Sequence, residues 1–299
     1  MCDADGRPLP GNVGKGADGD LHRGDGGAGA VSAQLELDWH GGRPAARLRR
    51  RWPGVDALPW GSLAAAPIDD ALAAAARASW TDGAFSEYAS AAAFSALTQA
   101  LLEAGAPVDL TAMAADFVVD ELVHVELAAR VAAELGGAAP YQVDLERLAP
   151  VTAPGLPAIE RAAELALRIS CVGEALSVPV LAGSTRAAAH PLTRAVLARI
   201  VRDERPHADL GWLVLDWCGD RVDRARLGGV AARALASYAP LWQDGAGGDA
   251  PAAHRGLAGW MTADGLRRTL RRAVAVDVVA PLAARGIVVA PRDEVPAAS

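Results

Sequence analysis

Lysine, aromatic residues and cysteine are all scarce in this 299-residue chain. Its basic residues are almost all arginine, and the formal net charge is −7. A large nucleic-acid surface needs clustered basic side chains, so this acidic balance argues against a nucleic-acid partner. The three cysteines, Cys2, Cys171 and Cys218, are odd in number and far apart. They predict no disulfide framework, and we expect a reducing, cytoplasmic location.

Long uncharged apolar runs are missing as well. No stretch of 18 or more apolar residues is free of charged or polar side chains, which argues against a membrane span. The first residues also lack the basic segment followed by an apolar segment that marks a secretory signal. We therefore expect no membrane partner.

The first part of the chain differs in composition from the rest. Residues 1–32 contain nine glycines and almost no large apolar side chains, so we expect a disordered tail. Residues 33–67 mix tryptophans with proline and glycine and predict an irregular packing segment. Beyond them alanine, the strongest helix former, dominates and favours an all-α fold.

Four long helices are predicted over residues 68–104, 109–136, 158–186 and 191–218. Gly105 and Pro107 are the stop signals of the first helix, and Asp109 can cap the second. The proline-rich loop between the second and third helices is long enough for a crossover connection. Residues 68–219 therefore predict a four-helix bundle, and residues 220–299 a helical extension with helices near 221–239 and 263–284.

The second and fourth predicted helices each contain the motif Asp-Glu-x-x-His. The first copy is Asp120-Glu121 with His124, and the second is Asp203-Glu204 with His207. Residues three apart lie on one face of a helix, so each Glu and His can point to a common spot. A carboxylate and an imidazole placed in this way are a ready pair of ligands for Fe, Mn or Zn.

The two motifs lie within an internal repeat. Glu87 precedes Glu121 by 34 residues, and Glu174 precedes Glu204 by 30. At 1.5 Å per residue, these spacings match a long helix, a turn and part of an antiparallel partner. All six candidate ligands can therefore meet at one level of a bundle. Two divalent cations would neutralise the four carboxylates, whose burial would otherwise be very unfavourable.

With these residues, the chain resembles the ferritin-like di-metal carboxylate superfamily over about residues 68–219. That family takes one Glu from each of two helices and a Glu-x-x-His from each of the other two. The resemblance implies that Glu87, Glu121 and His124 hold one iron, and that Glu174, Glu204 and His207 hold the other. It also implies that Glu121 and Glu204 bridge the metals and take part in catalysis. Asp120 and Asp203 would orient the histidine of the opposite motif.

The resemblance further implies two iron ions (Fe²⁺/Fe³⁺), or manganese, as cofactors. The expected function is a di-iron oxidase or oxygenase that uses O₂ to oxidise a small or carrier-bound organic substrate. An oxygenase would need an electron donor, and a homodimer is compatible with the family. The alternative is a non-catalytic or iron-handling (ferroxidase-type) ferritin-like protein, because the fold alone does not choose the reaction. The sequence leaves the native metal, the substrate and the electron donor open.

Each of these assignments has a simpler alternative. The six ligands could be ion-pair ladders on solvent-facing helices, although residues at helical spacing around them are apolar. Asp120 and Asp203 could be plain surface acids, and Cys171 is more simply a small core residue. Glu126 and Glu134 flank the first motif on other faces, so we expect both to be solvated.

Pro206 interrupts the second motif. A proline inside a helix removes one hydrogen-bond donor and favours a kink. Such a kink would widen the site or shift His207, which makes this histidine the least secure of the six ligands.

Overall fold

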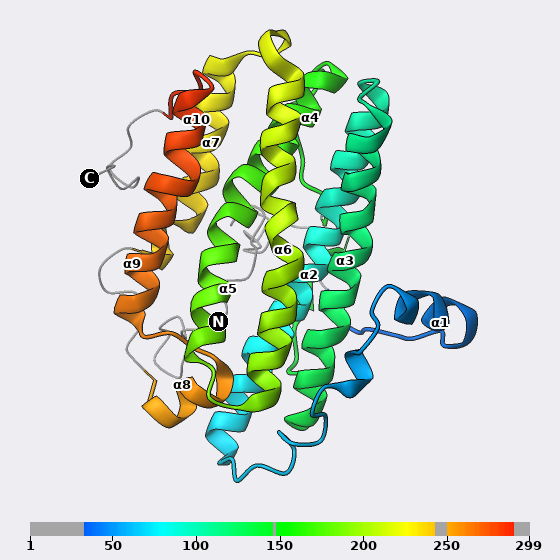
Figure 1. Cartoon of the computed structure of the whole chain (residues 1–299), viewed down its shortest axis with the longest axis vertical. Coiled ribbons are helices and arrows are strands. Elements are labelled where there is room, and N and C mark those ends of the chain that lie inside the picture. Colours follow the sequence, from blue (N-terminus) through cyan, green and yellow to red (C-terminus); the bar gives the residue numbers. More distant parts are fainter. Residues whose placement is uncertain (1–32, 146–147, 243–249, 290–299) are drawn as a thin grey trace.

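Helices make up most of the structure. The computed structural model describes residues 33–145, 148–242 and 250–289. Four long helical segments lie side by side (Figure 1): α2 (Asp70–Glu103), α3 (Val108–Glu134), the continuous segment formed by α4 (Ala158–Ala166), the π-helical turn η3 (Leu167–Glu174) and α5 (Ala175–Ala187), and α6 (Pro191–Cys218). The prediction of an all-α protein is confirmed, and the four predicted spans agree with these bounds to within two residues.

The helix ends follow local chemistry. The Asp69 side chain accepts a hydrogen bond from the Leu72 amide at 2.8 Å and so caps the start of α2. Gly105 ends the turn after α2 with a φ of 65°, a conformation that favours glycine. Pro191 is the first residue of α6, where its missing amide hydrogen costs no helical hydrogen bond.

The connection between α3 and α4 spans residues 135–157. In Figure 1 both helices begin at the same end of the molecule, so this connection runs back along the length of the bundle. It contains β2 (Gln142–Val143), which pairs antiparallel with β1 (Ala33–Gln34). The N-terminal part of the described chain is thereby attached to the outside of the bundle.

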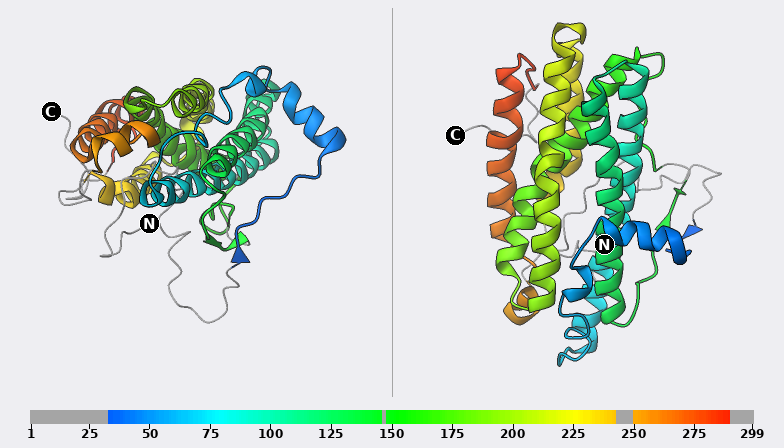
Figure 2. Two further views of the ribbon diagram at one scale, coloured as in Figure 1. Left: turned by 90° about the horizontal axis from the view of Figure 1, so that it is seen from below. Right: turned by 45° about the vertical axis from the view of Figure 1, so that its right-hand side comes forward.

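Further helices cover one side of the bundle. The segment formed by α9 (Ala263–Ala273), the π-helical turn η6 (Val274–Val279) and α10 (Ala280–Ala284) packs against α5, and α7 (Arg224–Tyr238) packs against α4 and η3 (Figure 2). The other short elements are α1 (Gly42–Arg50), α8 (Ala252–Ala258) and the 3₁₀ turns Val55–Ala57, Gly219–Arg221 and Ala239–Leu241. The predicted tail (1–32) and most of the predicted linker near 244–253 lie outside the described residues.

Helix α1 lies in the segment that the sequence predicts to be irregular. None of its residues is buried, so it has no apolar stripe from which a helix could be recognised. Its arginines instead reach α3, where Arg49 pairs with Glu126. Glu126 is only 5% exposed, so the expectation that it is solvated is wrong.

Glu134 has a structural role at the end of α3. Its carboxylate accepts hydrogen bonds from the amides of Leu63 at 3.0 Å and Ala64 at 3.3 Å, and from that of Gly61. It therefore holds the turn that leads into α2, and is not simply a solvated side chain as expected.

The buried apolar side chains form two clusters along the bundle. One cluster includes Phe94, Leu176 and Leu210, and the other includes Trp80, Leu127 and Leu197. On α2 the second cluster ends at residue 84 and the first begins at residue 93. Between the two clusters, a short level of the bundle can therefore hold polar side chains.

One helix of the described residues, Ala158–Ala187, is long and apolar enough to cross a membrane by length and composition alone. Of the most apolar 18-residue window of this helix, a share of 78% is buried inside the protein. Such burial is also typical of a core helix, so the feature is weak support for a membrane span.

Gly211 lets α6 approach the third segment of the bundle closely. A Cβ atom at this position would lie 2.6 Å from the Cys171 Sγ, 2.7 Å from the Ser170 Cβ and 2.9 Å from the Ala166 carbonyl oxygen. We expect Gly211→Ala to lower the free energy of unfolding by about 1–3 kcal/mol, because backbone and short side chains must move apart. Chemical denaturation measures this change. The matched control is Gly229→Ala, since its nearest neighbour is a flexible arginine at 3.6 Å; an equal loss in both variants would contradict the argument.

Candidate metal centre

Six polar side chains from all four segments of the bundle meet at the level between the two apolar clusters. None of them exposes more than 7% of its surface, and four are fully buried. They are Glu87 of α2, Glu121 and His124 of α3, Glu174 at the end of η3, and Glu204 and His207 of α6. The sequence motifs therefore do not form solvent-facing ion-pair ladders.

The six residues form two overlapping groups of four. Within each group, one potential ligand atom per residue lies within 4.8 Å of all the others. The groups are Glu87, Glu121, His124 and Glu204, and Glu121, Glu174, Glu204 and His207. Glu121 and Glu204 belong to both groups. This arrangement could hold two metal ions, with the two shared glutamates between them.

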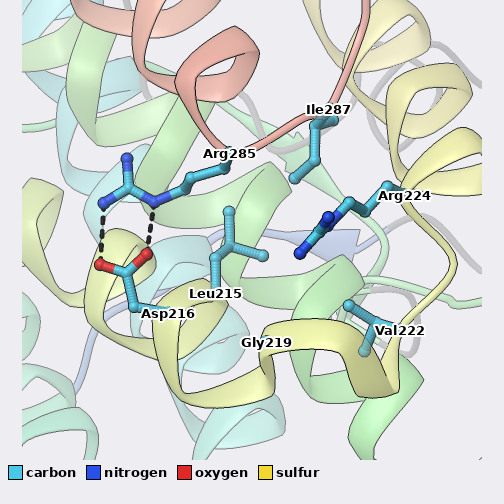
Figure 3. Close-up of a pocket in the computed structure, with 7 residues that line it drawn as sticks. All are labelled: Leu215, Asp216, Gly219, Val222, Arg224, Arg285 and Ile287. Atoms are coloured by element: carbon cyan, nitrogen blue, oxygen red, sulfur yellow. Dashed lines mark hydrogen bonds and ion pairs between the residues drawn. The ribbon is translucent and has the colours of Figure 1, made fainter.

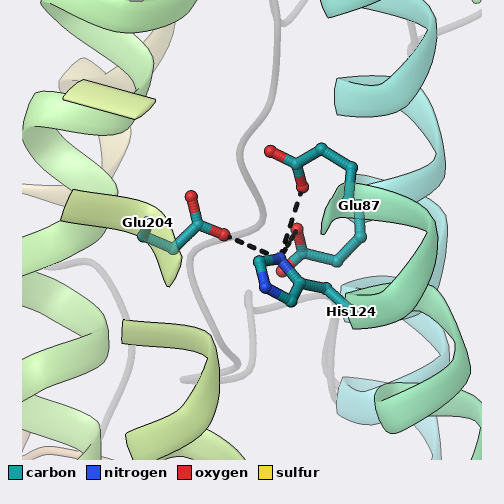
Figure 4. Close-up of side chains that lie close together, drawn as sticks. Glu87, His124 and Glu204 are labelled. Carbon is teal, nitrogen blue, oxygen red and sulfur yellow. Dashed lines mark ion pairs between the residues drawn. The ribbon is translucent and has the colours of Figure 1, made fainter. Parts of the chain in front are cut away.

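The first group is centred on His124 (Figure 4). Its Nδ1 atom lies 3.0 Å from a carboxylate oxygen of Glu204, 3.6 Å from Glu121 and 3.7 Å from Glu87. The ring therefore points one nitrogen into a space that carboxylates from three helices surround. A cation in this space would contact oxygen and nitrogen atoms at once.

The second group repeats this geometry around His207. The Nδ1 atom of His207 lies 2.9 Å from a carboxylate oxygen of Glu204 and 3.1 Å from one of Glu121. In each glutamate, this is the oxygen that does not face His124. The predicted kink at Pro206 does not displace this histidine. Helix α6 continues through Pro206, and the His207 side chain is fully buried.

The opposite ring nitrogen of each histidine faces an aspartate. His124 Nε2 lies 3.5 Å from Asp203, and His207 Nε2 lies 3.8 Å from Asp120. Each aspartate comes from the motif on the other helix, as the family resemblance implies. The distances are those of ion pairs and are longer than a hydrogen bond. Both aspartates are partly buried, so they are not plain surface acids.

The carboxylates around the histidines change how the rings titrate. Burial alone would lower the pKa of His124 and His207, but the charge of Glu204 and the contacts with the other carboxylates raise both well above the usual value of 6.5. For Asp203, burial works to raise the pKa, and contacts with His124 and Arg199 lower it below its usual value. Without a metal, the two rings carry positive charge that offsets part of the carboxylate charge.

The donor set fits a pair of transition-metal ions. None of the four histidine ring nitrogens has a partner with hydrogen-bond geometry among the described residues, although all four are buried. Mixed carboxylate and imidazole ligands suit Fe, Mn and Zn, and the structure does not select among these metals. Buried polar atoms of this kind need partners, and metal ions at the Nδ1 positions would supply them.

Two features around the ligands were not predicted from the sequence. The third segment contains the π-helical turn η3, which ends at Glu174 and so sets how this carboxylate enters the site. Two phenylalanines also pack on the second histidine, with ring centroids of Phe117 and Phe94 at 4.0 Å and 5.2 Å from that of His207. A π turn hardly changes the apolar pattern of a helix, so the sequence carries little signal for it.

Other titratable side chains of the described residues have structural roles. Cys171 is fully buried against Gly211, and burial raises the pKa of its thiol well above the usual value, which suits a core residue. His254 lies 3.4 Å from Asp69, away from the six ligands.

Metal binding should release protons. The raised pKa values of His124 and His207 favour the protonated rings in the metal-free protein, and a metal ligand must be neutral. We expect about two protons to leave per chain when ferrous iron binds anaerobically at pH 7. Isothermal titration calorimetry in buffers of different ionisation enthalpy measures this number. Binding without proton release would show that the rings are neutral in the metal-free protein.

Comparison with known proteins gives no relative for this chain. No protein-family model matches it, and searches of curated proteins and of solved structures each find no match. What the structure establishes is an all-α protein with a buried cluster of glutamates and histidines that could hold metal ions.

Proposed function

We propose that the chain is a ferritin-like di-iron protein that uses O₂ to oxidise or oxygenate a small or carrier-bound organic substrate. The observation that carries the proposal is the pair of overlapping ligand groups that share Glu121 and Glu204. In this assignment Glu87 and His124 complete one iron site, and Glu174 and His207 complete the other. The four carboxylates would balance the charge of two divalent ions.

When bound, two ferrous ions supply the electrons with which O₂ is activated for attack on an organic bond. The chain's own residues hold and orient the site. Asp203 and Asp120 face the outer nitrogens of the histidines, and Nδ1 of each ring faces the glutamate carboxylates, where it would bind a metal ion. Phe94 and Phe117 pack on the fully buried ring of His207 and give this side of the site an apolar lining.

Several parts of the proposal rest on the family resemblance. They are iron as the native metal, an electron donor for an oxygenase reaction, and a cytoplasmic location. Manganese would fit the same donor atoms. Iron storage is the rival function, and it predicts a different response to excess iron.

Metal analysis tests the site directly. After anaerobic loading with ferrous iron and desalting, we expect about two irons per chain, with Mössbauer spectra of a magnetically coupled pair after O₂ is admitted. Glu121→Ala should remove this coupled signal, because the variant lacks a ligand that both sites share. Asp116→Asn is the matched control on the same helix, since the Asp116 side chain is 64% exposed and pairs with Arg51 outside the six ligands.

The outcomes separate the candidate functions. A coupled pair that forms in the control and not in Glu121→Ala supports the di-iron assignment. Uptake of many irons per chain into a mineral would support iron storage. The absence of stoichiometric iron in the folded wild-type protein would overturn the proposal.

A further inference from the structure

A cavity that is open to solvent lies on the outside of α6, away from the six ligands. It has a volume of about 300 Å³, within the range of small-ligand sites. It is formed between the segment 52–58 and one face of α6. The residues that matter for its chemistry are Trp52, Val55, Leu58, Ala198, Arg199 and Arg202.

One wall of the cavity is apolar and rigid. Trp52 and Val55 are each only 3% exposed, and both belong to the buried apolar cluster at this end of the bundle. The Val55 carbonyl also accepts a hydrogen bond from the Trp60 indole at 2.7 Å, which fixes the turn. Because both side chains are almost fully covered, the apolar surface that a ligand would meet comes mainly from Leu58, which is partly buried, and Ala198, which is exposed.

The other wall carries two arginines that share one carboxylate. Arg199 donates from Nε to Asp203 at 2.6 Å, and the Nε of Arg202 lies 3.5 Å from the same side chain. The Arg199 guanidinium also lies over the Trp52 ring, 5.0 Å from its centroid. Among the described residues, the terminal amino groups of these two arginines make no hydrogen bond or ion pair. Two positive charges therefore face the cavity with one negative charge between them.

A cavity at the opposite end of α6 shows the contrast. There, Arg285 binds Asp216 through two hydrogen bonds of 2.6 and 2.9 Å (Figure 3), and Arg224 pairs with Asp220 at 2.5 Å. Each arginine in that cavity has its own carboxylate. Of these two cavities, only the one at Trp52 has more arginines than carboxylates that pair with them.

We propose that the cavity at Trp52 binds an organic anion, with a carboxylate on the two arginines and an apolar group against Leu58 and Ala198. Guanidinium groups bind carboxylates through paired, charge-assisted hydrogen bonds, and terminal amino groups of both arginines are available for this. None of the cavity residues is one of the six candidate ligands. The proposal therefore stands independently of the metal and of the reaction.

The cavity also touches the candidate metal centre through one side chain. Asp203 contacts Arg199 on the cavity side and faces His124 on the other side, at 3.5 Å. A substitution of Arg199 would therefore disturb both places. Arg202 is the better position for a test, because its side chain is 66% exposed and lies farther from Asp203.

Calorimetric titration of the full-length chain with benzoate, without added metal, tests the proposal. We expect one benzoate per chain with a Kd of about 1 mM or below. Benzamide, which has the same shape without the charge, should bind at least about tenfold more weakly. Inorganic phosphate should also bind at least about tenfold more weakly, because it cannot use the apolar wall.

Three variants locate the site. Arg202→Gln should weaken benzoate binding about tenfold or more, and Ala198→Leu should abolish it by filling the cavity. Arg205→Gln is the matched control, because Arg205 is an exposed arginine on the same helix that does not line the cavity. All three should keep the metal content of the wild type. The proposal is overturned if benzoate does not bind, if benzamide binds equally well, or if Arg202→Gln and Ala198→Leu leave binding unchanged.

Discussion

The burial of four carboxylates and two imidazoles at one level of the helical bundle is the constraint on which the structure depends. A buried charge without compensation is among the most costly features a protein can contain. Here, apolar clusters lie on both sides of the polar level, so water cannot supply the compensation. Two divalent cations would balance the four carboxylates and would also bind the Nδ1 atoms of both histidines, which have no partner with hydrogen-bond geometry among the described residues.

This constraint extends outward from the six ligands. Each histidine is placed between the buried carboxylates and an aspartate, and Asp203 is in turn held by Arg199 at the edge of the cavity beside Trp52. Charges of alternating sign therefore lead from the centre of the bundle to its surface. The same chain of contacts connects the candidate metal centre with the proposed anion site, although the two are separate binding sites.

Much of the helical framework could be predicted from the sequence. Ala-rich segments and stop signals such as Gly105 are local, and the four main helices follow from them. The predicted cap at Asp109 is wrong, because α3 already begins at Val108 after Pro107 and Asp109 lies inside its first turn. The spacing of Glu87, Glu121 and His124, repeated in the second half of the bundle, was also sufficient to bring six polar residues together. Regular helices turn such spacing into a position in space.

The features that were missed depend on contacts between distant parts of the chain. Glu126 was expected to be solvated, but Arg49 reaches it from a helix that no apolar pattern marks. The π-helical turn before Glu174 leaves the sequence pattern nearly unchanged. The cavity at Trp52 arises where residues 52–58 meet α6, which is more than a hundred residues away in the sequence. Local periodicity contains no information on these encounters.

The most direct measurement is anomalous X-ray diffraction at the iron edge from crystals of the iron-loaded protein. The account predicts two peaks about 3.5–4 Å apart, enclosed by the six side chains, with Glu121 and Glu204 between them. Peaks confined to the protein surface, or a folded bundle in which either histidine ring turns away from the carboxylates, would contradict it.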